Sequence, residues 1–224
     1  MTAIVFDLDG TLVESAPGIQ KVANRLMDEI GLAPLDLAEV HKFVGAGTPV
    51  FLQRAFESRE FLCSKQEFSR HLDRMSRLYE EAPGADSPPM PGADAVLRAL
   101  HKKGCELALC TNKWEAPTRV ILSAHDWSGL FEAVIAGDTL AERKPDPAPL
   151  IAAAEHLRKR PVFYVGDSDI DAETAEAAGI PFLIFTEGYR RKELSELTHA
   201  ATFSDFTELP TLIGQMAGWV QGEQ

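Results

Sequence analysis

The sequence predicts an α/β fold: a doubly wound, mostly parallel, Rossmann-like sheet with an inserted helical cap domain. Two observations predict the sheet. Short apolar runs of strand length recur along the chain, and helical patterns alternate with them. Runs that are apolar throughout are typical of strands buried on both faces of a parallel sheet, and the alternation indicates double winding. A third observation predicts the insertion, because one long segment contains helical patterns and no convincing strand.

Five apolar runs are the expected strands, and three segments between them are expected helices. Gly104 and Gly179 mark the ends of two of these helices, because glycine readily adopts the left-handed conformation that closes a helix. The expected strands are residues 3–6, 105–110, 133–136, 162–165 and 181–185, and the expected helices are residues 93–103, 147–157 and 171–178.

The inserted segment spans residues 14–81 and is rich in Leu, Phe and Arg. Ala16-Pro17-Gly18 lies near its start, and the proline-rich residues 82–92 follow its end. Prolines at this density are typical of semi-rigid hinges. We therefore expect an α/β catalytic core of residues 1–15 and 88–224, and a helical cap domain of residues 16–87.

Composition and charge exclude several classes of protein. The chain has 224 residues, of which 45% are hydrophobic and 25% charged, as in ordinary globular proteins. A net charge of −12 without a basic stripe argues against nucleic-acid and anionic-membrane partners. We expect a cytoplasmic protein, because there is neither a long apolar run nor a signal-peptide pattern. The three cysteines, Cys63, Cys105 and Cys110, are odd in number and fit reduced, packed side chains.

Acidic and polar residues directly follow three of the expected strands. They are Asp7, Asp9, Thr111, Asn112, Asp167, Asp169 and Asp171. Because open α/β sheets bind ligands outside the carboxyl ends of their strands, we expect these side chains to converge at one edge. Crowded carboxylates repel one another unless a cation joins them, and several oxygen ligands beside a phosphate suit Mg²⁺. The sequence therefore predicts a magnesium and phosphate site.

Lys144 is the basic residue that we expect to balance this acidic edge, although a solvated loop lysine is the simpler interpretation of Lys144 alone.

Two other kinds of binding site do not fit the sequence. A calcium loop that starts at Asp167 would need Gly and Glu where the chain has Ala172 and Ala178. Residues 45–48 lack the lysine that a nucleotide-binding P-loop requires.

Four motifs resemble, in their order, those of the haloacid dehalogenase superfamily: residues 7–11, 111–112, 144–145 and 166–171. The resemblance spans nearly the whole chain. Within the superfamily the chain is most similar to the phosphoglycolate phosphatases, on residues 6–18 and on residues 43–48 leading to Arg54-Ala55. Relatives commonly have Asp where this chain has Glu14, and we expect that difference to affect the hinge.

The resemblance implies how a phosphoryl group would be transferred. Asp7 would be the nucleophile and form an aspartyl-phosphate. Asp9 would be the general acid for the leaving alkoxide and then the base that activates water. Thr111 and the Asn112 backbone would bind the phosphoryl group. Lys144 would bind a phosphoryl oxygen and restrain Asp7.

The resemblance also implies a magnesium site. The Asp7 side chain, the Asp9 backbone carbonyl and Asp167 would hold Mg²⁺. Asp171 would orient these ligands or their waters without binding the metal itself.

The cap would select the substrate. Gly45 and Gly47 permit close backbone approach, and Thr48 followed by Pro49 is typical of a helix N-cap and first helical residue. Exposed amides there could bind a substrate carboxylate, with Arg54 as the counter-charge. The alternative is an ordinary helix start with a solvated Arg54.

We therefore expect a Mg²⁺-dependent phosphomonoester hydrolase that acts on a small phosphorylated metabolite, with 2-phosphoglycolate as the first candidate, and that is a monomer or a homodimer. A phosphatase for another small ester and a phosphosugar mutase are the alternative enzymes. A non-enzymatic metal- or phosphate-binding module is the alternative of another class. It fits less well, because binding alone needs no acid at Asp9.

Overall fold

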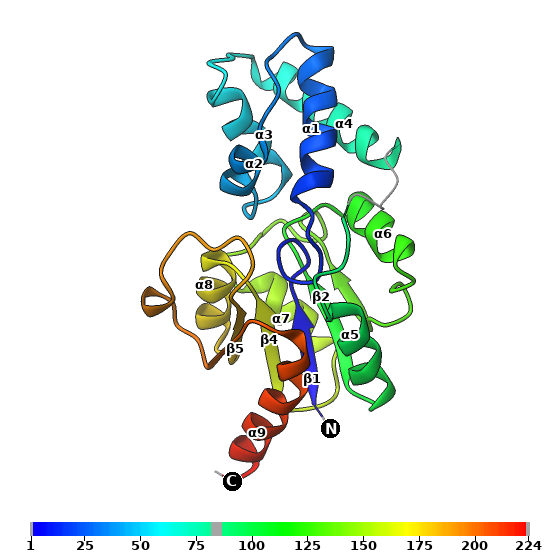
Figure 1. Ribbon diagram of the computed structural model, residues 1–224, viewed down its shortest axis with the longest axis vertical. Coiled ribbons are helices and arrows are strands. Elements are labelled where there is room, and N and C mark those ends of the chain that lie inside the picture. Colours follow the sequence, from blue (N-terminus) through cyan, green and yellow to red (C-terminus); the bar gives the residue numbers. More distant parts are fainter. Residues whose placement is uncertain (1, 82–86, 223–224) are drawn as a thin grey trace.

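The computed structural model describes residues 2–81 and 87–222. Within them, six parallel strands form one sheet in the order β3-β2-β1-β4-β5-β6 (Figure 1). The order reverses beside the central strand β1, as in a doubly wound sheet. The expected fold class is confirmed. The strands are β1 (Ala3–Phe6), β2 (Glu106–Cys110), β3 (Ala133–Ile135), β4 (Val162–Gly166), β5 (Phe182–Phe185) and β6 (Ala201–Phe203).

Helices cover both faces of the sheet. Successive side chains of a strand point to opposite faces, so the apolar strands place side chains on both faces that the helices bury. Ile4 and Phe6 of β1 belong to a hydrophobic cluster with α5, α6 and α9. Ala3 and Val5 belong to a second cluster, with α7 and α8. All four of these β1 side chains are fully buried. The core helices are α5 (Ala93–Lys102), α6 (Glu115–Ala124), α7 (Ala148–Glu155), α8 (Asp169–Ala178) and α9 (Leu209–Gly222).

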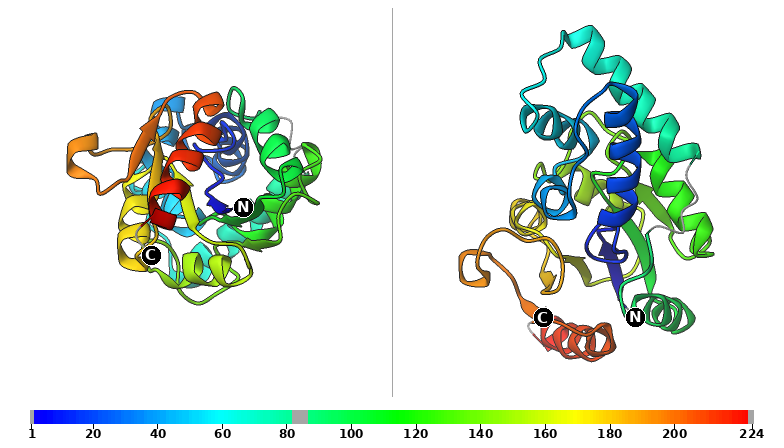
Figure 2. Two further views of the ribbon diagram at one scale, coloured as in Figure 1. Left: turned by 90° about the horizontal axis from the view of Figure 1, so that it is seen from below. Right: turned by 45° about the horizontal axis from the view of Figure 1, so that its top comes forward.

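Four further helices form a group of their own beyond the carboxyl ends of the strands (Figure 1). In Figure 2, α1 and α4 lie side by side, and their apolar faces share a third hydrophobic cluster with α2 and α3. They are α1 (Ala16–Glu29), α2 (Leu37–Phe43), α3 (Thr48–Glu57) and α4 (Lys65–Glu81). We call this group the cap. Its expected limits at residues 16 and 87 stay a prediction, and residues 82–86 of the second expected hinge lie outside the described residues.

Sequence patterns missed some elements and misplaced some helix ends. The edge strand β6 has only three residues, of which one is buried, so it leaves no apolar run to detect. Helices α6 and α9 were also not expected. Helix α8 begins two residues earlier than expected, because Ser168 and Asp171 form a capping box. No helix in the described ranges is both long enough and apolar enough to cross a membrane.

The cysteines provide a test of this packing. Cys110 ends β2 and is fully buried, and burial raises the pKa of its thiol to about 12. Cys63 and Cys105 are partly exposed. Because the thiolate is the reactive form, we expect a thiol-reactive dye at pH 8 to label two cysteines in the native protein and the third only in denaturant. Cys110→Ala should leave the number labelled in the native protein unchanged. Rapid native labelling of all three would contradict the buried position of Cys110.

Candidate active site

A cavity lies between the carboxyl ends of the strands and the cap, and it brings together most of the residues expected at the site. Those that line it are Asp7, Asp9, Thr111, Asn112 and Asp167 from the core, and Gly45 and Thr48 from the cap. Lys144 and Asp171 are buried and do not line the cavity, and Lys144 forms ion pairs with both Asp7 and Asp171. Arg54 does not line the cavity.

Lys144 lies between two carboxylates. Its Nζ is 2.9 Å from Asp7 Oδ1 and 2.7 Å from Asp171 Oδ1, and it donates to the Tyr164 hydroxyl at 3.0 Å. Tyr164 in turn donates to Asp171 Oδ1 at 2.5 Å. Burial works against the charge of Asp171, but Lys144 holds the pKa of that carboxyl below its usual range. This network fixes Lys144 and Asp171 beneath Asp7.

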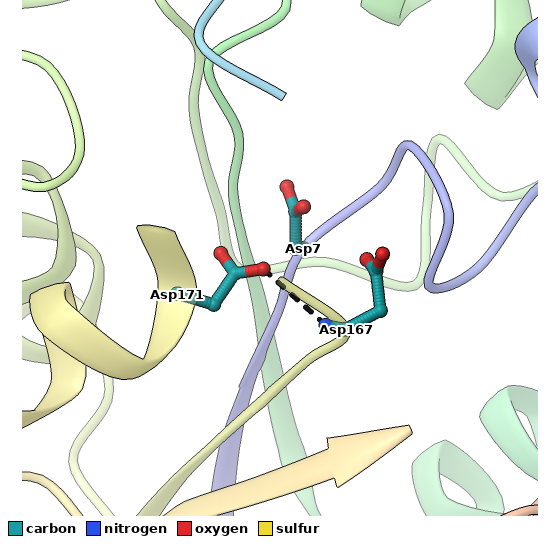
Figure 3. Close-up of side chains that lie close together, drawn as sticks. All are labelled: Asp7, Asp167 and Asp171. Carbon is teal, nitrogen blue, oxygen red and sulfur yellow. Dashed lines mark hydrogen bonds between the residues drawn. The ribbon is translucent and has the colours of Figure 1, made fainter. Parts of the chain in front are cut away.

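The three carboxylates Asp7, Asp167 and Asp171 form a buried triad at the strand ends (Figure 3). One oxygen of each lies within 4.8 Å of the others. Burial, with help from the other two carboxylates, raises the pKa of Asp167 well above its usual range. Burial likewise raises the pKa of Asp7 to about 7, against the opposing effect of Lys144. A cation between Asp7 and Asp167 would reverse both shifts, because opposite charge favours the ionised form.

Hydrogen bonds decide which members of the triad could face a cation. The Asp171 oxygens accept from Lys144, Tyr164 and Ser168. Asp7 borders the cavity, and its Oδ1 is buried with an ion pair to Lys144 but no hydrogen bond of good geometry. Asp167 accepts from Thr11 and from the Tyr189 amide, but unlike Asp171 it lines the cavity. Asp7 and Asp167 are therefore the better candidates for direct metal ligands.

Asn112 and Thr111 are placed by the loop after β2. The Asn112 side chain accepts from the Lys144 amide and donates to the Lys144 carbonyl, both at 3.0 Å, so it fixes the loop that carries the lysine. It also donates to the Gly45 carbonyl of the cap at 3.2 Å. Asn112 therefore connects the lysine loop, the cavity and the cap.

Lys113 lies in the cavity wall, and the sequence analysis missed it. Its ammonium is buried and lies 3.1 and 3.3 Å from the two oxygens of Asp9. It also lies 5.1 Å from the centre of the Tyr79 ring on α4, within the range of a cation–π contact. Lys113 thus holds Asp9 and contacts the cap at the same point. In the sequence, only its position directly after Thr111-Asn112 indicated that Lys113 could belong to the site.

Arg191 occupies the position that we expected for Arg54. Arg191 lines the cavity and donates through Nη2 to the Val44 carbonyl at 2.7 Å. Arg54 donates to the preceding carbonyl, that of Phe43, at 3.0 Å, and lines a separate surface depression. The two arginines therefore bond the carbonyls of consecutive cap residues, and both border this depression, but of the two only Arg191 also lines the cavity.

Helix α3 begins at the cavity, but one residue earlier than expected. Gly47, with φ of 87°, is its N-cap residue, and Thr48 is the first helical residue. A side chain is disfavoured at Gly47, because a Cβ there would lie 3.0 Å from the Asn112 carbonyl oxygen. The close approach of cap and core therefore explains why residue 47 is a glycine.

The parallel sheet and the carboxylate cluster define the class of the protein first: an α/β protein with a Rossmann-like core and a candidate site at the carboxyl ends of its strands. A model of the haloacid dehalogenase-like hydrolase family matches residues 1–179. The chain belongs to this family.

Relatives narrow the class. A phosphoglycolate phosphatase from Cereibacter sphaeroides is 48% identical over 213 residues, covering 95% of this chain and 98% of the relative. One from Rhodobacter capsulatus is 40% identical and covers 97% of each chain. A crystal structure described as a predicted phosphoglycolate phosphatase from Haemophilus somnus has a TM-score of 0.86 at 29% identity, covering 95% of this chain and 97% of that one. The expected family and the expected phosphomonoester hydrolase are confirmed.

Gly188 provides a test of how closely the site is packed. A Cβ at Gly188 would lie 2.3 Å from the Cβ of Asp167, whereas a Cβ at Gly129 would meet nothing within 4 Å. We expect Gly188→Ala to lower the free energy of unfolding by about 1–3 kcal/mol, as overpacked positions do. Gly129→Ala should change it by less than about 0.5 kcal/mol. Urea denaturation measures both, and equal effects would show that residue 188 does not lie against Asp167.

Proposed function

We propose that this protein hydrolyses 2-phosphoglycolate with Mg²⁺ as cofactor. One observation carries the chemistry: Asp7 lies at the floor of the cavity, between the ammonium of Lys144 and the carboxylate of Asp167. The choice of substrate is supported by relatives named phosphoglycolate phosphatase that align over nearly their whole length. The guanidinium of Arg191, which lines the cavity, also suits a small acid.

Hydrolysis would proceed in two displacements at phosphorus. In the first, an Asp7 oxygen forms a bond to phosphorus, the bond to the substrate oxygen breaks, and Asp9 gives that oxygen a proton. In the second, Asp9 takes a proton from water, the water oxygen bonds to phosphorus, and the bond to Asp7 breaks. Free phosphate leaves and Asp7 is regenerated.

The remaining residues would position these groups and balance charge. Lys144 neutralises a phosphoryl oxygen and restrains Asp7, while Thr111 and the Asn112 backbone bind the phosphoryl group. Lys113 keeps both oxygens of Asp9 at the cavity wall. Phosphoryl transfer depends chiefly on in-line positioning and charge neutralisation, which is why few residues suffice.

Mg²⁺ would be held by the Asp7 side chain, the Asp9 backbone carbonyl and Asp167, and it would draw negative charge from the phosphoryl oxygens. The triad fits this ion because three buried carboxylates face the single ammonium of Lys144. Asp171 already accepts hydrogen bonds from Lys144 and Tyr164, and it would act by orienting these two side chains.

The cap, proposed to comprise residues 16–87, would select the substrate and cover the cavity. The start of α3 and Arg191 border the cavity opposite Asp7, so the backbone amides and the guanidinium are available to a substrate carboxylate. Closure of the cap over the core would exclude bulk water. A cytoplasmic location and a monomeric or homodimeric state stay predictions.

Release of phosphate tests the proposed reaction. With Mg²⁺, the protein should release inorganic phosphate from 2-phosphoglycolate faster than from other esters in a panel of small phosphomonoesters. Asp7→Asn should lower kcat by about 10³-fold or more, because loss of a nucleophile removes the covalent route. EDTA should abolish turnover, and added Mg²⁺ should restore it. No phosphate release from any ester in the panel would refute the reaction.

Two matched variants test the proposed specificity. Arg191→Gln should raise KM for 2-phosphoglycolate about tenfold or more, the scale of one lost charged hydrogen bond. It should leave KM for p-nitrophenyl phosphate within about twofold, because that ester has no carboxylate. Arg54→Gln removes the same charge and also loses a bond to a loop carbonyl, but should leave both values nearly unchanged. An equal effect of Arg191→Gln on both substrates would remove Arg191 from carboxylate recognition.

A further inference from the structure

Tyr189 contacts the carboxylate triad through its backbone. Its amide donates to Asp167 Oδ2 at 2.6 Å. The neighbouring backbone is closely packed as well. A Cβ at Gly10 would lie 2.6 Å from Asp167 Oδ2 and 2.7 Å from the Tyr189 ring. Asp167 and the tyrosine therefore share one tightly filled space with the loop that follows Asp9.

The side chain of Tyr189 ends at the junction between core and cap. Its hydroxyl accepts from the amides of Ser15 at 3.0 Å and Ala16 at 3.1 Å, where α1 begins. It donates to Glu14 Oε1 at 2.5 Å. Ser15 makes no capping bond of its own, and its buried hydroxyl has no hydrogen-bond partner in the described residues. Glu14 Oε1 also accepts from the Ala16 amide, at 3.2 Å. Tyr189 and Glu14 thus cap the start of α1 together, satisfying amides that a helix start leaves unpaired.

The ring of Tyr189 also packs against the cap. It stacks with His41 of α2, with ring centres 5.1 Å apart and 28° between the planes, and it belongs to the periphery of the cap's hydrophobic cluster. One residue of a core loop therefore contacts a triad carboxylate, the start of the first cap helix and a second cap helix.

We infer that Tyr189 is a positioning residue that couples Asp167 to the orientation of the cap. A shift of the Asp167 carboxylate moves the backbone of residue 189, and the hydroxyl transmits that shift to the first turn of α1. The reverse also holds, because a coupling between two sites is reciprocal. The Mg²⁺ part of this inference rests on the proposed metal at Asp7 and Asp167; the contact with α1 does not.

Tyr189→Phe isolates the hydroxyl, because it keeps the backbone amide on Asp167 and the ring on His41. Without metal, hydrogen exchange of the amides in residues 14–20 should become about five- to thirtyfold faster, the effect of losing a helix cap. Tyr164→Phe is the matched control: it also removes a buried tyrosine hydroxyl, but one bonded to Asp171 and Lys144, so exchange in residues 14–20 should not change. Unchanged exchange in Tyr189→Phe would refute the contact's role at α1.

Magnesium chloride then tests the coupling. In the wild-type protein, Mg²⁺ should slow exchange in residues 14–20 severalfold. In Tyr189→Phe it should still raise the Tm but leave that exchange unchanged. An equal slowing in both proteins, or binding without any slowing in the wild type, would overturn the coupling. If Mg²⁺ fails to raise the Tm of the wild-type protein, the proposed metal site and the coupling both fail, while the metal-free comparison still decides the role at α1.

Variants of Glu14 and the steady-state kinetics of Tyr189→Phe give two further tests. Glu14→Gln keeps an acceptor for the Tyr189 hydroxyl and for the Ala16 amide and should behave as wild type in exchange. Glu14→Ala removes both bonds and should accelerate exchange at least as much as Tyr189→Phe does. Should Tyr189→Phe not fold, unchanged exchange in Glu14→Ala would still refute a role of the Tyr189–Glu14 pair at α1. In the hydrolysis assay, Tyr189→Phe should raise KM for 2-phosphoglycolate severalfold with kcat changed less than twofold. A fall in kcat with unchanged KM would place the tyrosine's effect on the chemistry instead of on cap orientation.

Discussion

The burial of three carboxylates beside a single ammonium is the constraint on which the rest of the structure depends. Ionised groups are costly to bury unless they are paired and hydrogen-bonded, and Asp7, Asp167 and Asp171 are all buried. Lys144 pairs two of them, while Thr11 and the Tyr189 amide donate to the third. The strand ends, the helix cap at Ser168 and the lysine loop are therefore all arranged around one concentration of negative charge.

The cap completes this arrangement, because the core by itself forms only one side of the cavity. Besides those of Tyr189, three contacts at the cavity connect the two parts: Asn112 with Gly45, Lys113 with Tyr79, and Arg191 with Val44. Each starts from a residue that follows a core strand and ends on a cap backbone carbonyl or a cap ring. Residues that would bind the substrate thus also contact the cap or lie beside residues that do. Substrate binding and closure of the cavity would therefore depend on the same few side chains.

The sequence predicted those features that depend on neighbouring residues. Each apolar run predicts a strand, and the acidic residues that follow it, Asp7 and Asp9 or Asp167, predict a site at the end of that strand. The reason is that parallel strands bring their carboxyl ends to one edge of the sheet. Lys113, Tyr164 and Tyr189 were missed, since each acts on a partner distant in the sequence. Arg54 was assigned by its place along a helix, but the side to which a helix presents a residue depends on packing. The short strand β6 was missed because its residues are mostly not buried.

The central position of β1 has a consequence for synthesis of the chain. The side chains of β1 are fully buried, and its backbone pairs with β2 and β4, which begin about a hundred residues or more further along. β1 is synthesised before both of its partners, so it has none until about half of this chain has been made, and contacts between such distant segments form slowly. The cap helices are continuous in sequence and share a hydrophobic cluster. The cap helices can therefore pack against one another before β1 has paired with β2 and β4.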